Sequence, residues 1–130
     1  MKTDDYILQI ERHSHHDRDD WGVESDSYDS YDADLAGLQV GDTLYPTEYR
    51  GEKLARRRDP QTYLKCLLIE DTQLMFRFHF LENYRGVEIA VGPDAPATAG
   101  GSTDRSSARY TLRLVPKAQY VPKQGYIKYQ

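Results

Sequence analysis

The sequence contains a single cysteine, Cys66, and no apolar run long enough to cross a membrane as a helix. One cysteine excludes an internal disulfide, which is typical of proteins from reducing compartments. Residues 2–5 are polar, and the start of the sequence shows no apolar stretch of the length that a secretory signal peptide needs. We therefore expect a cytoplasmic protein that has no membrane partner.

Positive charge is scarce at the N-terminal end. Residues 1–34 contain eleven Asp and Glu but three Lys and Arg, whereas residues 35–130 contain ten Asp and Glu and fourteen Lys and Arg. The formal net charge of −4 and the pI near 5.5 argue against nucleic acid as an electrostatic partner. We call residues 1–34 the acidic front. Because residues 35–130 are basic, we predict that the acidic front pairs with them or contacts another protein.

Long helical patterns are absent as well. Only Glu52–Arg58 has a helix signature, with an acid four residues before an arginine and Pro60 as a stop, and an exposed connector fits the same residues. Alternating apolar and polar residues, which are typical of strands, recur instead at 6–10, 62–69, 73–81, 87–91 and 110–114, and in the tail 119–130.

The clearest of these strands form a hairpin. The short polar turn Glu70–Thr72 joins them, and the second strand places Leu74, Phe76, Phe78 and Phe80 on one face. Burying each phenylalanine would contribute roughly 1.5–3 kcal/mol before entropy costs. We predict one domain over residues 1–130, a mostly β fold built as a small antiparallel β-sandwich or barrel of five to seven strands with at most one short helix.

Two segments interrupt the strand pattern. Residues 13–34 are rich in Asp, Ser, His and Tyr and contain almost no core material, so we predict an acidic polar loop or arm. Residues 92–107 are rich in Gly, Pro, Ala and Ser, which predicts a flexible loop, either a functional lid or a disordered connection.

The histidines near the N-terminus suggest a metal site. If the first strand continues past Ile10, His13 and His15 project from one face, about 7 Å apart, and can share one metal ion. Asp19 and His79 are the further ligands that we predict. The spacing resembles the His-X-His strand motif of cupin barrels, which implies a metal-binding barrel, although the flanking glycines and the second motif of that family are missing. The competing interpretation is a set of solvated polar residues.

A Ser-Asp-Tyr near-repeat in the acidic segment suggests a protein contact. Tyrosine supplies contact area at low entropy cost, and carboxylates pair with Arg or Lys of a partner. The same acids do not match a calcium-binding EF-hand loop, which needs a turn glycine and a closing glutamate. The residues that we predict to contact a partner are Tyr28, Asp29, Tyr31 and Asp32.

Two other features are less specific indications of a functional site. Arg56, Arg57 and Arg58 form a basic cluster that could contact phosphate, although pairing with the acidic front is simpler. Cys66 shares a strand face with Leu64 and Leu68, which predicts a buried small hydrophobe rather than a nucleophile. The sequence contains no nucleophile elbow, P-loop, dinucleotide fingerprint or zinc-finger spacing.

These patterns favour a non-enzymatic protein-binding or structural β module without a cofactor, whose partner is another protein or a second copy of the chain. The alternative is a metal-binding protein or enzyme that holds a divalent transition metal at His13 and His15. Whether His79 converges with these two histidines in the fold distinguishes the hypotheses.

Overall fold

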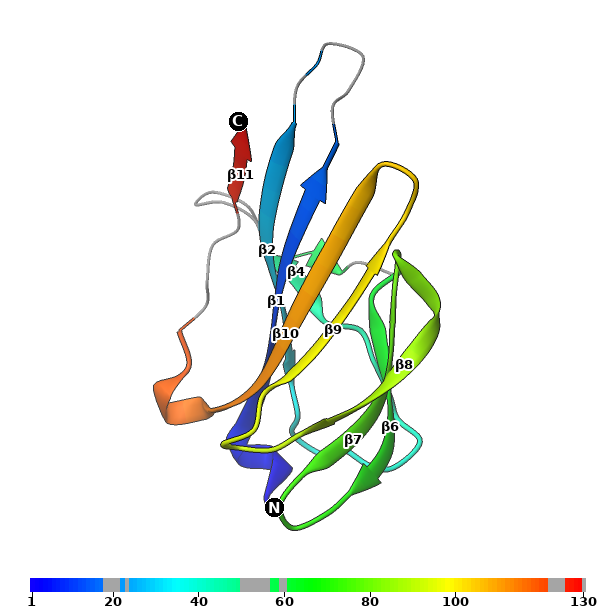
Figure 1. Ribbon diagram of the computed structural model, residues 1–130. Coiled ribbons are helices and arrows are strands. Elements are labelled where there is room, and N and C mark those ends of the chain that lie inside the picture. The colour runs from blue at the N-terminus through cyan, green and yellow to red at the C-terminus, as the bar shows by residue number, and fades with distance from the viewer. Residues whose placement is uncertain (18–21, 23, 50–56, 59–60, 122–125, 130) are drawn as a thin grey trace.

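The computed structural model describes residues 1–17, 22, 24–49, 57–58, 61–121 and 126–129 (Figure 1). Its strands pair antiparallel and form two separate sheets, as in a sandwich. Apart from the short 3-10 turns η1 (Thr3–Asp5) and η2 (Lys117–Gln119), the described residues contain no helix. The prediction of a mostly β, antiparallel fold is therefore confirmed. None of the helices found in these residues has the length and apolar character needed to span a membrane.

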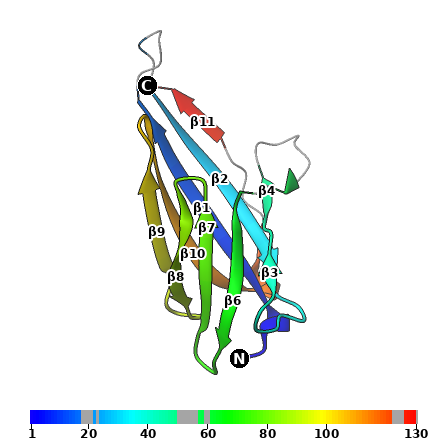
Figure 2. The same ribbon diagram turned by 90° about the vertical axis from the view of Figure 1, so that its right-hand side faces the viewer.

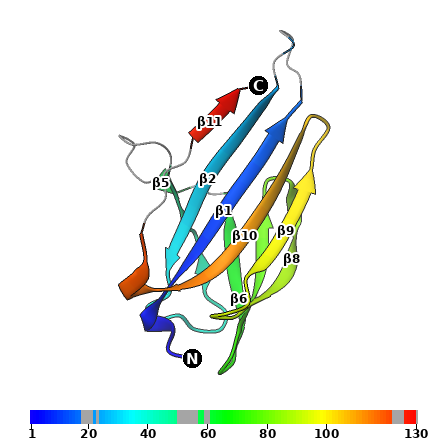
Figure 3. The ribbon, with the colours of Figure 1, turned by 60° about the vertical axis from the view of Figure 1, so that its left-hand side comes forward.

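The larger sheet, called sheet A, has the strand order β5-β4-β2-β1-β10-β9, and β11 also pairs with β2. Figure 3 shows β2, β1, β10 and β9 side by side. At its centre β1 pairs with β10 from Tyr6 opposite Pro116 to His16 opposite Ser106. The strands are β1 Tyr6–His16, β2 Ser25–Asp34, β4 Thr47–Tyr49, β5 Arg57–Arg58, β9 Ala97–Ser102, β10 Ser106–Pro116 and β11 Tyr126–Tyr129.

The smaller sheet, called sheet B, has the strand order β3-β6-β7-β8 and lies across the strands of sheet A (Figure 2). Its strands are β3 Thr43–Leu44, β6 Tyr63–Ile69, β7 Leu74–Phe80 and β8 Asn83–Val91. The predicted hairpin is confirmed, and its apolar face is fully buried in one core cluster with sheet A. That face consists of Leu74, Phe76, Phe78 and Phe80, and it shares the core with Leu8, Ile10, Tyr110, Leu112 and Leu114.

The acidic segment contains a central strand, so the prediction of a loop or arm over 13–34 is wrong for most of its length. β1 continues to His16, and residues 25–34 form β2. A strand this polar is stable in the sheet because partners satisfy its carboxylates: Asp26 contacts two histidines, Asp29 contacts Arg12, and Asp32 accepts hydrogen bonds from Ser30 and Tyr120.

The Gly- and Ala-rich segment 92–107 is also structured, which corrects the prediction of a flexible loop. It contains β9 and the first residues of β10. The small side chains serve close packing here: a Cβ at Gly101 would lie 2.6 Å from the carbonyl oxygen of Glu82, in the turn between β7 and β8. A glycine at this position therefore allows sheet B to approach the edge of sheet A.

The strands are more numerous than the predicted five to seven, because several short ones join the edges of both sheets. Part of the predicted helix Glu52–Arg58 lies outside the described residues, and its last two residues form β5 instead. The tail supplies the expected edge strand, β11, which pairs with β2 from Tyr126 opposite Tyr28 to Tyr129 opposite Ser25.

Candidate functional site

His13 and His15 share the outer face of sheet A, as predicted, and both contact Asp26 of β2. Nε2 of His13 and Nδ1 of His15 each lie 3.0 Å from the same oxygen, Oδ1, of Asp26. The register explains this convergence, because His15 lies directly opposite Asp26 and His13 lies opposite Tyr28. The ring of Tyr28 stacks on that of His13 with a centroid distance of 4.4 Å.

The electrostatics of this histidine–aspartate cluster stabilise its charged form. Hydrogen bonds from His13 and then His15 lower the pKa of Asp26, and the hydrogen bond to Asp26 raises the pKa of His15. The carboxylate therefore links two histidines of β1 to β2 across the sheet.

The metal prediction is corrected at His79, which belongs to sheet B and stacks on Tyr63 instead of joining His13 and His15. Asp19 lies outside the described residues. Among the residues that the structure describes, no group of three His, Cys, Asp or Glu side chains is arranged to hold a metal ion. A metal at His13 and His15 stays a prediction, which elemental analysis of the untagged protein tests.

We expect the contribution of His15 to the stability of the protein to be lost as the pH rises from 5.5 to 8.5. A raised folded pKa means that the contribution of His15 is complete below its ordinary pKa of 6.5 and is lost as the pH rises through the folded value. Asp26, with its lowered pKa, contributes above its ordinary 3.8 and loses this contribution in acid. Melting temperatures at both pH values should show a smaller decrease for His15→Gln than for the wild type. The exposed neighbour provides the control His16→Gln, and equal pH slopes in all three proteins would contradict the prediction.

Most of the residues predicted to contact a partner are buried, which corrects that prediction. Asp29, Tyr31 and Asp32 are buried in sheet A, so they cannot form an exposed patch, and only Tyr28 is partly exposed. Of the predicted phosphate cluster, Arg57 and Arg58 form β5, and Arg56 lies outside the described residues. Cys66 is buried as predicted, and burial raises the pKa of its thiol.

A pocket that no pattern in the sequence predicts lies on sheet B, at the end where β7 turns into β8. It has a volume of about 250 Å³. Two of its residues are large and exposed: Leu81 is 56% exposed and Tyr84 is 78% exposed. We call it the sheet B pocket, and its lining consists of Gln61, Tyr63, His79, Phe80, Leu81 and Tyr84.

Backbone irregularities hold the pocket residues in place. Phe78 pairs with Val87 and Phe80 pairs with Asn83, so His79 faces a bulge of three residues, 84–86. Nδ1 of His79 lies 3.2 Å from the carbonyl oxygen of Tyr84 and donates a hydrogen bond to it. The imidazole lies between the ring of Tyr63, at 4.4 Å, and Gly86, where a Cβ would come within 2.7 Å of it.

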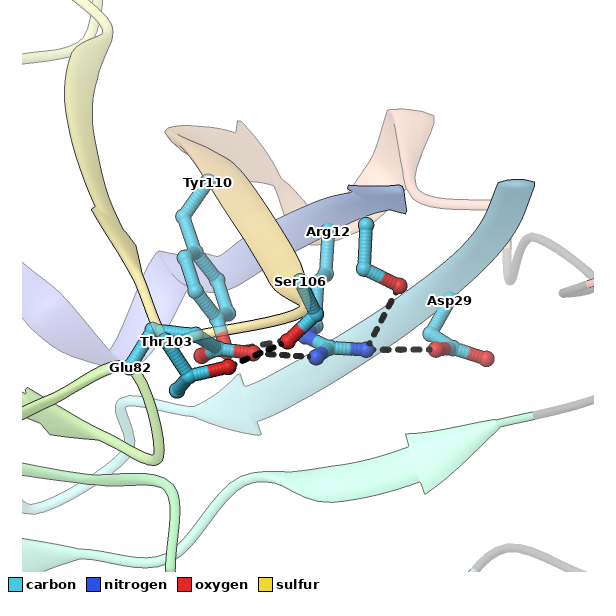
Figure 4. A network of polar contacts seen from close by, with 7 residues as sticks. Arg12, Asp29, Glu82, Thr103, Ser106 and Tyr110 are labelled. Carbon is cyan, nitrogen blue, oxygen red and sulfur yellow. Dashed lines mark hydrogen bonds and ion pairs between the residues drawn. The ribbon is translucent and has the colours of Figure 1, made fainter. Parts of the chain in front are cut away.

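A buried ionic network anchors the turn that carries the pocket (Figure 4). Arg12 of β1 forms ion pairs with Glu82 of the β7–β8 turn and with Asp29 of β2. Its Nε donates to the hydroxyl of Tyr110 at 3.0 Å, and one of its terminal nitrogens donates to Ser14 at 3.1 Å. Glu82 follows Leu81 and precedes Asn83, the last paired residue before the bulge, so this network fixes the turn of sheet B to the inner face of sheet A.

Tyr110 completes the network as a neutral donor. Burial raises the pKa of its phenol, which therefore stays protonated, and the hydroxyl donates to Glu82 at 3.4 Å. The carboxylates of Glu82 and Asp29 and the phenol of Tyr110 meet at the guanidinium of Arg12, and each has a hydrogen-bond partner, as a buried network requires. These residues serve the structure and position the turn.

No protein-family model, curated protein or solved structure matches this chain. No family, activity or ligand is therefore assigned by similarity. Between the two candidate sites, the histidine–aspartate cluster forms contacts within sheet A, whereas the sheet B pocket offers unfilled volume beside exposed apolar side chains.

Proposed function

We propose that the chain is a non-enzymatic protein-binding module that accepts an apolar side chain of its partner in the sheet B pocket. The observation that carries this proposal is the exposure of Leu81 and Tyr84 at the rim of the pocket. Large apolar side chains that gather around a concave site are typical of interaction surfaces.

The size of the pocket supports a side chain rather than a cofactor as its occupant. Sites for drug-sized ligands are typically about 300–1,000 Å³, and this pocket has about 250 Å³. Aromatic walls with a few polar atoms are common where a partner inserts an anchor residue.

The rigidity of the pocket also supports binding. The contacts of His79 with Tyr63 and Tyr84, and the anchoring of Glu82 to Arg12, hold the walls before any partner arrives. Pre-organised surfaces bind more tightly because less side-chain and loop entropy is lost on association. The single cysteine supports a cytoplasmic location for this binding, which cell fractionation tests.

Selection from a displayed peptide library tests the proposal. We expect the wild type to enrich peptides with one large apolar residue, and the double variant Leu81→Ser with Tyr84→Ala to bind those peptides at least about tenfold more weakly, because truncating an anchor contact typically costs more than about 1 kcal/mol.

Val40 provides a matched control, because it is 59% exposed and does not line the pocket. The variant Val40→Ser should bind the selected peptides as the wild type does. Full binding by the double variant, or the absence of any enriched peptide, would refute the proposal. Sedimentation at several protein concentrations shows separately whether a second copy of the chain occupies the site.

A further inference from the structure

We propose that the partner segment is acidic, with a carboxylate two positions from its apolar anchor when the segment is extended. This inference rests on the proposed function, because it specifies the chemistry around the same pocket.

The outer face of sheet B places a row of charged residues next to the pocket. Tyr63 lies opposite His79, and two residues farther along the strands Lys65 lies opposite Arg77, which lies opposite Glu88. Successive residues on one face of a strand are about 7 Å apart. An extended peptide that runs along the strands therefore reaches the charged row with the residue two positions from its anchor.

The charges beside the pocket favour an acidic ligand. Lys65 and Arg85 are exposed, and within the described part of the chain neither pairs with a carboxylate. Arg77 does have a partner, because its guanidinium lies 2.9 Å from Glu88. The row next to the pocket and the bulge thus contribute three cations, Lys65, Arg77 and Arg85, and one carboxylate, Glu88, although the chain as a whole has a net charge of −4.

This local excess of positive charge favours an acidic partner segment over a basic one. A carboxylate near Lys65 or Arg85 gains an opposite charge that the protein itself does not supply, whereas a lysine there meets like charge. The effect should weaken as salt increases, because exposed charges are screened over about 8–10 Å at physiological ionic strength.

Fluorescence anisotropy with short labelled peptides and the full chain tests the inference. The probes are blocked peptides with the sequence Gly-Glu-Ser-Phe-Ser-Glu-Gly, a counterpart with lysine at both glutamate positions, and a counterpart with alanine in place of phenylalanine. We expect the glutamate peptide to bind about tenfold more tightly than the lysine peptide at low salt. The peptide with alanine in place of phenylalanine should bind more weakly than the glutamate peptide that keeps the phenylalanine.

Charge-reversal variants of the protein test whether the preference for the glutamate peptide arises at the outer face of sheet B. Lys65→Glu and, separately, Arg85→Glu should reduce or invert the preference for the glutamate peptide. Arg109→Glu is the matched control, because Arg109 is exposed on β10 of sheet A. Thermal unfolding of each variant establishes that it folds.

Equal binding of the glutamate and lysine peptides, or tighter binding of the lysine peptide, overturns the inference and leaves the proposed function standing. Binding of neither peptide also overturns it, and the library selection then shows independently whether the pocket accepts an apolar anchor. A preference that Arg109→Glu removes as strongly as Lys65→Glu overturns the assignment to sheet B.

Discussion

Arg12→Met should lower the free energy of unfolding by about 3–5 kcal/mol, because it removes the cation from a buried ionic network. The side chains of Glu82 and Asp29 are 1% and 2% exposed, so water cannot replace the guanidinium. Tyr110 and Ser14 lose hydrogen bonds in the same variant. Urea unfolding at neutral pH, followed by circular dichroism, measures the difference.

Arg113→Met is the matched control, because Arg113 bonds Glu11 on the exposed face of sheet A and its side chain is 47% exposed. Exposed ion pairs contribute about 0–1 kcal/mol, so this variant should stay close to the wild type. Adding Glu82→Met to Arg12→Met should recover part of the loss, since it removes a buried carboxylate that has lost its ion pair with Arg12. Equal losses for Arg12→Met and Arg113→Met would contradict this role for the network.

Gly101→Ala should destabilise the protein by about 1–3 kcal/mol, which is the usual range when a group is forced into a packed site. The new Cβ would lie 2.6 Å from the carbonyl oxygen of Glu82, which is a backbone atom and cannot rotate away. The sign of the change in unfolding free energy tests this contact, because replacing glycine by alanine at an unstrained site stabilises a protein by about 0.4–1 kcal/mol. Chemical denaturation again provides the measurement.

The same variant should also weaken binding at the sheet B pocket, because a displaced Glu82 moves its neighbours in the turn. Thr98→Ala is the control on the same strand, at an exposed position. Stability equal to that of the wild type would show that the turn and β9 can separate without cost, and would contradict the role given to Gly101.

The predictability of the strands depends on where their partners lie in the sequence. The hairpin of β6 and β7 was predictable because every second residue of β7 is a large apolar one and the turn is short. β2 was not, because its aspartates become acceptable only beside Arg12, His13 and His15, and the register of β1 and β2 is a tertiary property. Composition alone assigned the same residues to a loop.

One member of the buried ionic network, Arg12, could have been recognised from the sequence. Arg12 follows Leu8 and Ile10 at a spacing of two, so it continues the apolar face of its strand. A charged side chain on an apolar face requires a buried partner, or the strand must end before it. The pattern could therefore have identified Arg12 as a residue of interest, although nothing local pointed to Glu82, which is 70 positions away.

The pocket was hidden by a register shift. A bulge between Cys66 and Leu68 moves the pairing of β6 and β7 by one residue and places Tyr63 opposite His79. Without the bulge, the register set by the turn would have paired Tyr63 with Phe80, which lies on the buried face. The shared face of His13 and His15, by contrast, follows from strand periodicity and was predicted.

The pairing of β1 with β10 has a consequence for how the chain folds. Arg12 and Tyr110 face each other across that pair and are 98 positions apart, whereas β6, β7 and β8 follow one another through short turns. Loop-closure entropy disfavours the distant contact, so sheet B can form from local hairpins before the centre of sheet A closes. A fragment that ends before β10 would leave the phenylalanine face without Tyr110, Leu112 and Leu114, and this exposed apolar surface would be prone to aggregation.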